Sequence, residues 1–222
     1  MLVRFLDIFL SIIALCVLAP LLIPISIILK FTGEGEIFYK QKRVGKHERN
    51  FLLLKFATML ESSPNIGAGE ITLKNDSRVL PFGKILRKTK INELPQIINI
   101  LLGHISVVGP RPMVPNTFNK YSKEAKCALK KVKPGLTGVG SIVFRDEEQF
   151  LDDQDDPRKF YDEHIIPFKN DLEVWFVLNQ SLMLYFKIIF ITAWVILFPK
   201  SRIVENLLKD LPSIPKEFKS YT

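Results

Sequence analysis

The sequence predicts a helix-rich α/β fold of the α+β kind, in which a small globular domain with short strands is joined to a membrane-associated helix. Three observations support this prediction: a long apolar run near the N-terminus, two short stretches typical of strands, and helical periodicity in much of the remaining chain. With 222 residues, the chain has the size of one ordinary domain, or of a domain with an attachment segment. We divide it into a membrane helix at 1–32, a main domain at 33–200 and a C-terminal tail at 201–222.

The composition indicates a membrane surface as a partner. The chain is 47% hydrophobic, contains 17 Phe and carries a net charge of +8. A basic chain can bind nucleic acid or anionic lipid, but the positive charges lie near apolar segments and the sequence holds no known nucleic-acid-binding module. We therefore expect a lipid bilayer and no nucleic acid. The two cysteines, Cys16 and Cys127, fit neither a disulfide framework nor a zinc site and favour a reducing compartment.

The apolar run at 8–29 holds no charged residue, and its 22 residues reach about 33 Å as a helix, enough to cross the hydrocarbon core. Pro20 and Pro24 each remove a backbone donor and clash with the preceding turn, which predicts a kink at Ala19-Pro20. Two topologies stay open on the residues alone: a kinked helix that spans the bilayer, and a re-entrant helix–break–helix that returns to its own side. Basic residues flank both ends, and positive charge favours the cytoplasmic side, which makes the re-entrant topology as reasonable as the spanning one.

Two short strands are predicted at 37–45 and 51–56, followed by a loop at 61–74 that is rich in Ser, Pro, Asn and Gly. The segment at 77–90 predicts a short basic amphipathic helix with Ile85 and Leu86 facing inward. Three of its basic side chains are available to a phosphate or a lipid headgroup: Arg87, Lys88 and Lys90.

The spacing of apolar residues predicts a helix from Ile91 to Gly103, with Asn92 as its N-cap and Pro95 in its first turn. Gly103 ends the helix. One helical face carries Ile91, Leu94, Ile97, Ile98 and Leu101.

The second half of the chain begins with a short strand at 105–108 that runs into the motif "GPRP". The segment at 135–144 is predicted to be extended, and the acidic segment at 145–158 to be a solvated loop, since it lacks the Gly and closing Glu of a calcium loop. The segment at 160–200 is helical and apolar, and it suits the membrane interface or the core.

Asn92 and Glu93 form the central candidate pair. Helix capping alone would explain the presence of both residues, because an amide at the N-cap and an acid in the first turn stabilise a helix. The functional interpretation uses the same geometry: free N–H groups bind an anion, and the neighbouring carboxylate holds Mg²⁺ on a phosphate.

Arginine and lysine residues supply candidate phosphate ligands. Arg111 lies between two prolines, which hold its planar guanidinium with little conformational freedom, as bidentate phosphate binding requires. Lys55, alone in an apolar strand, either extends to solvent or faces a phosphate. Arg87 is either a solvated helix charge or a second phosphate ligand.

The motifs "LRKTKINELPQIINILLGHISVVGPRP", "IFYKQKRVG" and "VKPGLTG" occur in this order, and together they closely resemble the bacterial sugar transferases. These are monotopic polyprenyl-phosphate phosphoglycosyl transferases, and the resemblance covers nearly the whole chain. It implies transfer of a sugar-1-phosphate from a UDP-sugar to undecaprenyl phosphate with release of UMP, and it implies Mg²⁺. It also implies catalysis on the cytoplasmic face of the bacterial inner membrane, with a re-entrant N-terminal helix whose break would lie at Ala19-Pro20. Apolar helices leave a homodimer open.

Carried over residue by residue, the resemblance places phosphate contacts at Lys55, Arg87 and Arg111. In the family an Asp-Glu pair begins the helix, the Asp as nucleophile and the Glu assisting Mg²⁺; here Asn92 stands at the Asp position and Glu93 at the Glu position. The segment after "GLTG" also departs from the family pattern, which implies a changed nucleotide-sugar side of the site with Arg145 facing it.

An amide is a poor nucleophile toward phosphorus, so three hypotheses follow. Glu93 takes the covalent role with Asn92 positioning it; the lipid phosphate attacks directly, with Mg²⁺ and arginines stabilising charge; or the chain is inactive. We expect an active enzyme because this chain has Lys55 and Arg111 at the positions where the family binds phosphate. The rival from another class is a silent membrane scaffold that binds nucleotide-sugar or polyprenyl phosphate.

Overall fold

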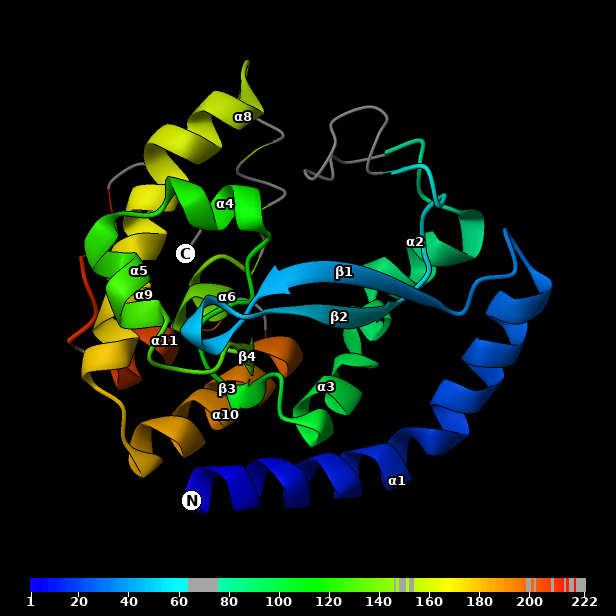
Figure 1. The fold of residues 1–222 in the computed structure, drawn as a ribbon, viewed down its shortest axis with the longest axis horizontal. Helices are drawn as coiled ribbons and strands as arrows, with labels where there is room; N and C mark the ends of the chain where they lie inside the picture. Colours follow the sequence, from blue (N-terminus) through cyan, green and yellow to red (C-terminus); the bar gives the residue numbers. More distant parts are fainter. Residues whose placement is uncertain are drawn as a thin grey trace. The chain divides into compact units, whose positions relative to one another are not determined.

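The computed structural model describes residues 1–63, 76–145, 147, 151, 154–198, 201, 203–208, 210–213, 215 and 218. The chain divides into two compact units. Unit 1 comprises Met1–Lys42 and Leu52–Gly103, and unit 2 comprises Arg43–Phe51 and His104–Thr222. The helix-rich fold with short strands is confirmed (Figure 1).

Unit 1 is built around the long helix α1, Leu2–Phe31, which holds both Pro20 and Pro24 inside its length. The helix is long and apolar enough to cross a membrane. Figure 1 shows it changing direction part-way along, as expected where a proline removes a backbone donor. The helix therefore bends, but it is continuous from Leu2 to Phe31 without an unwound break, and the position of the bend at Ala19-Pro20 stays a prediction.

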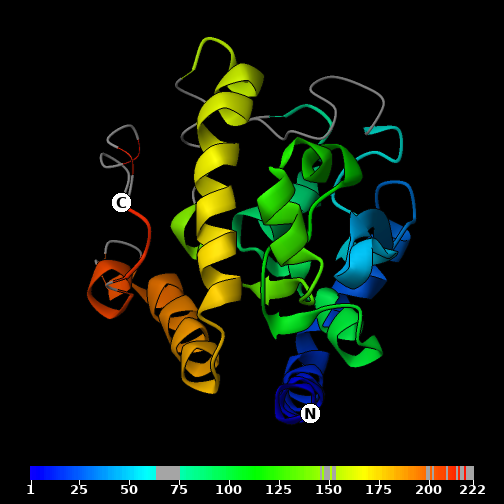
Figure 2. The ribbon, with the colours of Figure 1, turned by 60° about the vertical axis from the view of Figure 1, so that its left-hand side comes forward.

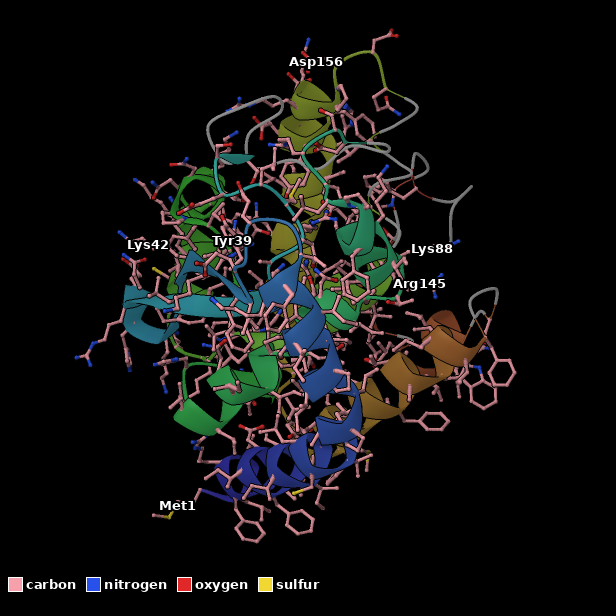
Figure 3. All side chains as sticks on the ribbon, turned by 90° about the vertical axis from the view of Figure 1, so that its right-hand side faces the viewer. Met1, Tyr39, Lys42, Lys88, Arg145 and Asp156 are labelled. Carbon is pink, nitrogen blue, oxygen red and sulfur yellow. The ribbon has the colours of Figure 1, made fainter. Side chains whose placement is uncertain are left out.

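Apolar side chains project from several sides of α1, which begins beside the labelled Met1 in Figure 3. Its exposed apolar residues include Phe5, Phe9 and Val17. Near its C-terminal end, by contrast, Ile25 and Leu29 are buried in a cluster with Phe56 and Leu86. The helix thus has an apolar exposed surface and packs locally against the rest of unit 1.

The two predicted strands are confirmed as a two-stranded sheet of β1, Phe38–Val44, and β2, Asn50–Phe56. A short turn η1, Lys46–Glu48, lies between them. The predicted loop at 61–74 falls mostly outside the described residues.

The amphipathic helix is confirmed as α2, Pro81–Lys88, but one of its two predicted inward residues is wrong. Leu86 is buried, whereas Ile85 is 58% exposed. Adjacent positions on a helix are about 100° apart, so a short helix that buries Leu86 turns Ile85 away from the core. Figure 3 labels Lys88 at the end of this helix.

The next helix starts later than predicted. A single 3₁₀ turn η3, Ile91–Glu93, precedes α3, Gln96–Leu102, and Gly103 ends α3 in the left-handed conformation, as predicted. The predicted N-cap at Asn92 is wrong: Lys90 begins the turn with a φ of 58°, and its carbonyl accepts the Glu93 N–H. The buried face of α3 also differs from the prediction and comprises Gln96, Ile97, Asn99 and Ile100.

Unit 2 contains the parallel strands β3, Ser106–Val108, and β4, Gly135–Thr137. Ser106 pairs with Gly135 and Val108 with Thr137. The connection between them is helical, as parallel pairing requires a crossover. It comprises α4, Pro115–Lys120, and α5, Lys123–Leu129.

The segment predicted to be extended at 135–144 is only partly so. Its first three residues form β4, but Val139–Val143 form the helix α6. Gly138 precedes the helix in an extended conformation and lets the chain change from strand to helix. The predicted acidic loop at 145–158 lies partly outside the described residues, and its end is the helix α8, Pro157–Phe160, capped by Asp156.

The apolar C-terminal part is helical, as predicted. α8 continues through the π-helical turn η4, Tyr161–Ile165, into α9, Ile166–Leu178, as one long helix (Figure 2). α10, Leu182–Leu197, follows after Ser181, whose side chain caps it. α11 spans Ile203–Leu207. α10 buries Ile188 and Ile191 and exposes Phe190 and Leu197, so its core role is confirmed and its place at a membrane interface stays a prediction.

Candidate active site

In unit 1, Lys55 and Glu93 meet as an ion pair. The Lys55 Nζ atom lies 3.0 Å from Glu93 Oε1, and the two side chains are 17% and 22% exposed. Lys55 comes from β2 and Glu93 from η3. Both residues were predicted from the sequence, and the structure brings them together within hydrogen-bonding distance with access to solvent.

Asn92 lies next to Glu93 but is 5% exposed, and its Oδ1 atom is buried without a hydrogen bond to any residue that the structure describes. A buried polar oxygen without a partner is uncommon and calls for an explanation. The amide therefore cannot present a nucleophile to a substrate in solvent, whereas the Glu93 carboxylate is accessible. Of the two members of the pair, Glu93 is the one that solvent reaches.

Asn99 holds the strand that carries Lys55, and sequence reasoning missed it. Its side chain is 1% exposed; Oδ1 accepts the Leu54 N–H at 2.8 Å and Nδ2 donates to the Leu52 carbonyl at 2.8 Å. The amide thus acts like a neighbouring strand for β2 and holds it against α3, one residue before Lys55. The available signal was a single amide in the apolar run "IINILL".

The start of α1 holds the other end of α3. Arg4 donates to the carbonyls of Ile100 at 2.5 Å and Leu101 at 2.7 Å, the last carbonyls of α3. A cation at a helix C-terminus satisfies free carbonyl groups and complements the helix dipole. Asp7, on the same helix, is buried with an exposure of 2%. The apolar helix α1 and the helix that follows Glu93 are therefore linked directly.

Arg87, in the last turn of α2, is half-buried, and its Nη1 atom lies 3.8 Å from the Met59 Sδ atom. α2 packs against η3, so Arg87 and Glu93 come from neighbouring elements of unit 1.

In unit 2, the loop Gly109–Pro112 is fixed largely by its backbone. The Gly109 N–H donates to Thr137 at 2.9 Å, and the Pro110 carbonyl accepts from Gly135 at 2.8 Å. A Cβ on Gly135 would lie 2.0 Å from the Gly109 nitrogen, so only glycine permits this approach. These contacts explain why "GPRP" and "KPGLTG" occur together: each contributes one side of the same backbone contact.

Arg111 is exposed at the centre of this loop and lines a hollow of unit 2. Arg43 donates from Nη1 to the Pro112 carbonyl at 2.8 Å and fixes the end of the loop. Behind the loop, the Arg111 N–H donates to Glu173 Oε1 at 3.4 Å. The hollow is lined by Val44, Gly45, Pro110, Arg111, Met113, Phe118, Leu129, Val132 and Pro134.

Arg145 follows α6, and its Nη1 atom donates to the Val195 carbonyl of α10 at 2.8 Å. The structure therefore brings Lys55, Asn92 and Glu93 together in unit 1, with Arg87 on an adjacent helix. Arg111 and Arg145 belong to unit 2, in separate loops.

Glu173 and Lys169 form a buried polar cluster that sequence reasoning missed. Burial raises the pKa of Glu173 to about 7, against the lowering effects of the Arg111 N–H, Lys169 and the Arg111 charge. Burial disfavours the Lys169 ammonium, but Glu147, 2.6 Å away, and Tyr161 outweigh it, so the pKa of Lys169 is raised. The sequence feature that could have indicated this cluster was a Lys and a Glu four residues apart in an apolar helix.

The bacterial sugar transferase family matches residues 1–199 of this chain. The chain belongs to the bacterial sugar transferase family. The prediction made from the motifs is thereby confirmed, including the class of enzyme. This match covers the ion pair at Lys55 and Glu93 and the loop at Arg111 alike.

Three relatives illustrate the breadth of this sugar transferase family. The chain is 35% identical to the exopolysaccharide production protein ExoY of Sinorhizobium fredii over 66% of this chain and 71% of that protein. It is 32% identical to the UDP-N-acetylgalactosamine-undecaprenyl-phosphate N-acetylgalactosaminephosphotransferase of Aeromonas hydrophila, over 87% of this chain and 43% of the relative. It is 31% identical to the uncharacterized sugar transferase EpsL of Bacillus subtilis, over 86% of this chain and 84% of that protein.

Proposed function

We propose that this sugar transferase moves a sugar-1-phosphate from a UDP-sugar to undecaprenyl phosphate, with release of UMP, at the cytoplasmic face of the bacterial inner membrane. The reaction is a first membrane step in the assembly of a glycan. One observation carries the proposal: the accessible Glu93 carboxylate faces the Lys55 ammonium on the unit that also holds the membrane helix. Relatives named as undecaprenyl-phosphate sugar phosphotransferases support the substrate classes.

Glu93 is the proposed nucleophile. Its carboxylate oxygen attacks the β-phosphorus of the UDP-sugar, and the bond from that phosphorus to the oxygen bridging the two phosphates breaks. UMP leaves with the bridging oxygen and its electron pair. A phosphate oxygen of undecaprenyl phosphate then attacks the phosphorus bound to Glu93, which releases the carboxylate and forms the lipid diphosphate sugar. No proton or redox partner is needed for either displacement.

Mg²⁺ is the proposed cofactor, and the residues fit its requirements. Mg²⁺ takes oxygen ligands and is commonly held by one or two carboxylates together with substrate phosphates. Glu93 offers a carboxylate that is 22% exposed beside the Lys55 ammonium, whereas the Asn92 Oδ1 atom is buried. Among the described residues, no three His, Cys, Asp or Glu side chains form a group that would hold a metal alone. When bound, Mg²⁺ neutralises phosphate charge during transfer.

The basic residues are proposed to bind phosphate groups. Lys55 neutralises charge next to Glu93, and Arg87 lies on the adjacent helix. Arg111, on its fixed loop, presents a planar guanidinium that suits bidentate binding of a phosphate. Arg145 is proposed to face the nucleotide-sugar, in the segment that departs from the family pattern.

The N-terminal helix is proposed to be re-entrant, with its bend at Ala19-Pro20 in the membrane. Both of its ends pack on the same unit: Arg4 contacts the end of α3, and Leu29 is buried with Phe56 and Leu86. A straight spanning helix of 30 residues would hold its ends about 45 Å apart, on opposite sides of the bilayer. The bend and the two anchored ends support a return to the cytoplasmic side.

The proposal is tested by assaying the purified chain in detergent with Mg²⁺, undecaprenyl phosphate and a panel of UDP-sugars. The panel comprises UDP-glucose, UDP-galactose, UDP-N-acetylglucosamine and UDP-N-acetylgalactosamine. We expect UMP release that depends on the acceptor over many turnovers with one or more donors. Binding of a donor without UMP release from any of them would instead support a silent scaffold. The mass of the detergent-solubilised protein tests the further proposal of a homodimer.

A further inference from the structure

The loop that presents Arg111 is held from its buried side by one carboxyl group. Glu173 is 3% exposed, lies on α9, and accepts the Arg111 N–H at Oε1. At 3.4 Å this hydrogen bond is longer than usual, so the attraction between the carboxylate and the Arg111 charge is needed beside it to hold the loop. The Arg111 charge acts on Glu173 as well, since it lowers the pKa of that carboxyl.

The backbone of α6 packs directly on the same carboxyl group. A Cβ on Gly140 would lie 2.5 Å from Glu173 Oε1 and 3.3 Å from its Cδ atom, so a side chain at this position would displace the carboxyl group. The other carboxyl oxygen, Oε2, is buried without a hydrogen bond to any described residue. The group is thus confined in position, yet only one of its two oxygens makes a hydrogen bond.

The charged and titratable groups around Glu173 come from several elements. Lys169 precedes it by one helical turn on α9 and pairs with Glu147. Tyr121 follows α4, and Glu173 is one of the charges that raise its pKa, after burial itself. Tyr161 lies on η4, and the Lys169 Nζ atom is 5.0 Å from the centre of its ring. Arg111 completes the surroundings on the loop side.

We propose that Glu173 is a positioning residue for Arg111: its ionised carboxylate holds the Gly109–Pro112 loop, and protonation loosens the loop and weakens binding of the UDP-sugar. This inference rests on the proposed function. Glu173 is not a catalytic residue, because it is buried and touches Arg111 rather than a substrate. Because the pKa of Glu173 is about 7, its carboxyl group gains or loses its charge within the pH range in which the enzyme is assayed.

The test follows kcat/KM for the UDP-sugar from pH 5.5 to pH 8.5, using the donor of the panel that gives the fastest UMP release. A diphosphate diester does not titrate in this range, so the donor itself adds no slope. For the wild-type enzyme we expect kcat/KM to fall about tenfold from pH 8 to pH 6, in line with removal of outer-shell support of a binding group. Most of the change should appear in KM.

The variant Glu173→Gln keeps the shape of the side chain and an oxygen acceptor but removes its charge. We expect it to have, at every pH, the low kcat/KM of the wild type at pH 6, with no slope. Gly140→Ala, which displaces the carboxyl group, should give the same flat profile. Glu163→Gln, an exposed acid on η4, is the matched control and should keep the wild-type profile.

A wild-type enzyme that releases UMP with a pH-independent kcat/KM would overturn the inference and leave the proposed function intact. So would a Glu173→Gln profile that follows the wild type. Absence of UMP release by the wild type with every donor would count against the proposed function itself. If Glu173→Gln does not fold, the wild-type profile and Gly140→Ala still decide the inference.

Discussion

Each unit of this sugar transferase contains a glutamate beside a lysine, and the two sets differ in exposure. In unit 1, Glu93 pairs with Lys55, and both side chains are partly open to solvent. In unit 2, Glu173 and Lys169 are buried, the lysine pairs with Glu147, and one oxygen of Glu173 has no partner among the described residues. Both sets consist of a glutamate and a lysine, but the first set is partly exposed to solvent and the second is buried.

This difference assigns different roles to the two acids. An accessible carboxylate can meet a phosphate, whereas a buried one can act only on its neighbours. The buried set also costs stability, because an ionised group removed from water is unfavourable unless it is fully paired. We therefore attribute chemistry to Glu93 and positioning to Glu173.

The largest expected effect comes from Glu93→Gln. Removing the proposed nucleophile while keeping its shape should lower kcat by about 10³-fold or more, since an amide does not displace a phosphate leaving group. Stability should change by only about 1 kcal/mol, because the ion pair is partly open to solvent and the amide keeps a hydrogen-bond acceptor for Lys55. The rate of UMP release measures kcat, and thermal unfolding measures stability. Near-normal turnover would remove Glu93 from the covalent role and favour direct attack by the lipid phosphate.

Arg111→Ala should lower kcat/KM for the donor by about 10²-fold, on the order of 3 kcal/mol, as when one charge-stabilising group is removed elsewhere. Arg158→Ala, an exposed arginine at the start of α8, is the control and should be neutral. An Arg111→Ala enzyme with the kinetics of the control would show that the fixed loop serves only the fold.

Glu173 should also make stability depend on pH. Its pKa in the folded protein, about 7, is above the ordinary value, so between these values the folded state binds a proton that the unfolded state has lost. Stability should therefore fall as the pH rises toward 7, by about 3 kcal/mol in total. Denaturant unfolding of wild type and Glu173→Gln at pH 5 and pH 8 measures the difference. An equal pH dependence of the two proteins would contradict this assignment.

Asn99→Ala should destabilise the chain by about 2 kcal/mol, because the Leu54 N–H and the Leu52 carbonyl would lose their partner inside the protein. It should also lower turnover, since β2 carries Lys55. Lys120→Ala breaks the half-exposed pair with Asp162 and serves as a control with an expected cost below about 1 kcal/mol. A cost for Asn99→Ala as small as that of the control would mean that β2 is held by other contacts.

Much of this organisation could be predicted from local sequence. The strands at β1 and β2, the helix α2 and the left-handed Gly103 follow from residue pattern and from turn chemistry. Lys55, Glu93 and Arg111 stand out because each is a charge in an otherwise apolar or rigid context, and the structure places each on an ordered element.

The remaining features depend on contacts between distant segments. Asn92 was expected to cap a helix, but the turn at Lys90 uses backbone hydrogen bonds and leaves the amide buried. The helix α6 was expected to be extended, because three glycines in a short segment obscure helical periodicity. Gly135 and Gly138 instead allow close backbone approach, and Gly140 leaves room for the Glu173 carboxyl group. The Glu173 cluster requires the register of α9 against the Arg111 loop, which no local pattern supplies.

The role of Glu93 is tested most directly by the mass of the intact protein after incubation with a UDP-sugar and Mg²⁺ in the absence of undecaprenyl phosphate. We predict an increase by the mass of one sugar-phosphate, located on Glu93 by peptide fragmentation and discharged when undecaprenyl phosphate is added. Glu93→Gln should show no increase. An unmodified wild-type protein that nevertheless releases UMP once the acceptor is present would contradict the covalent role of Glu93.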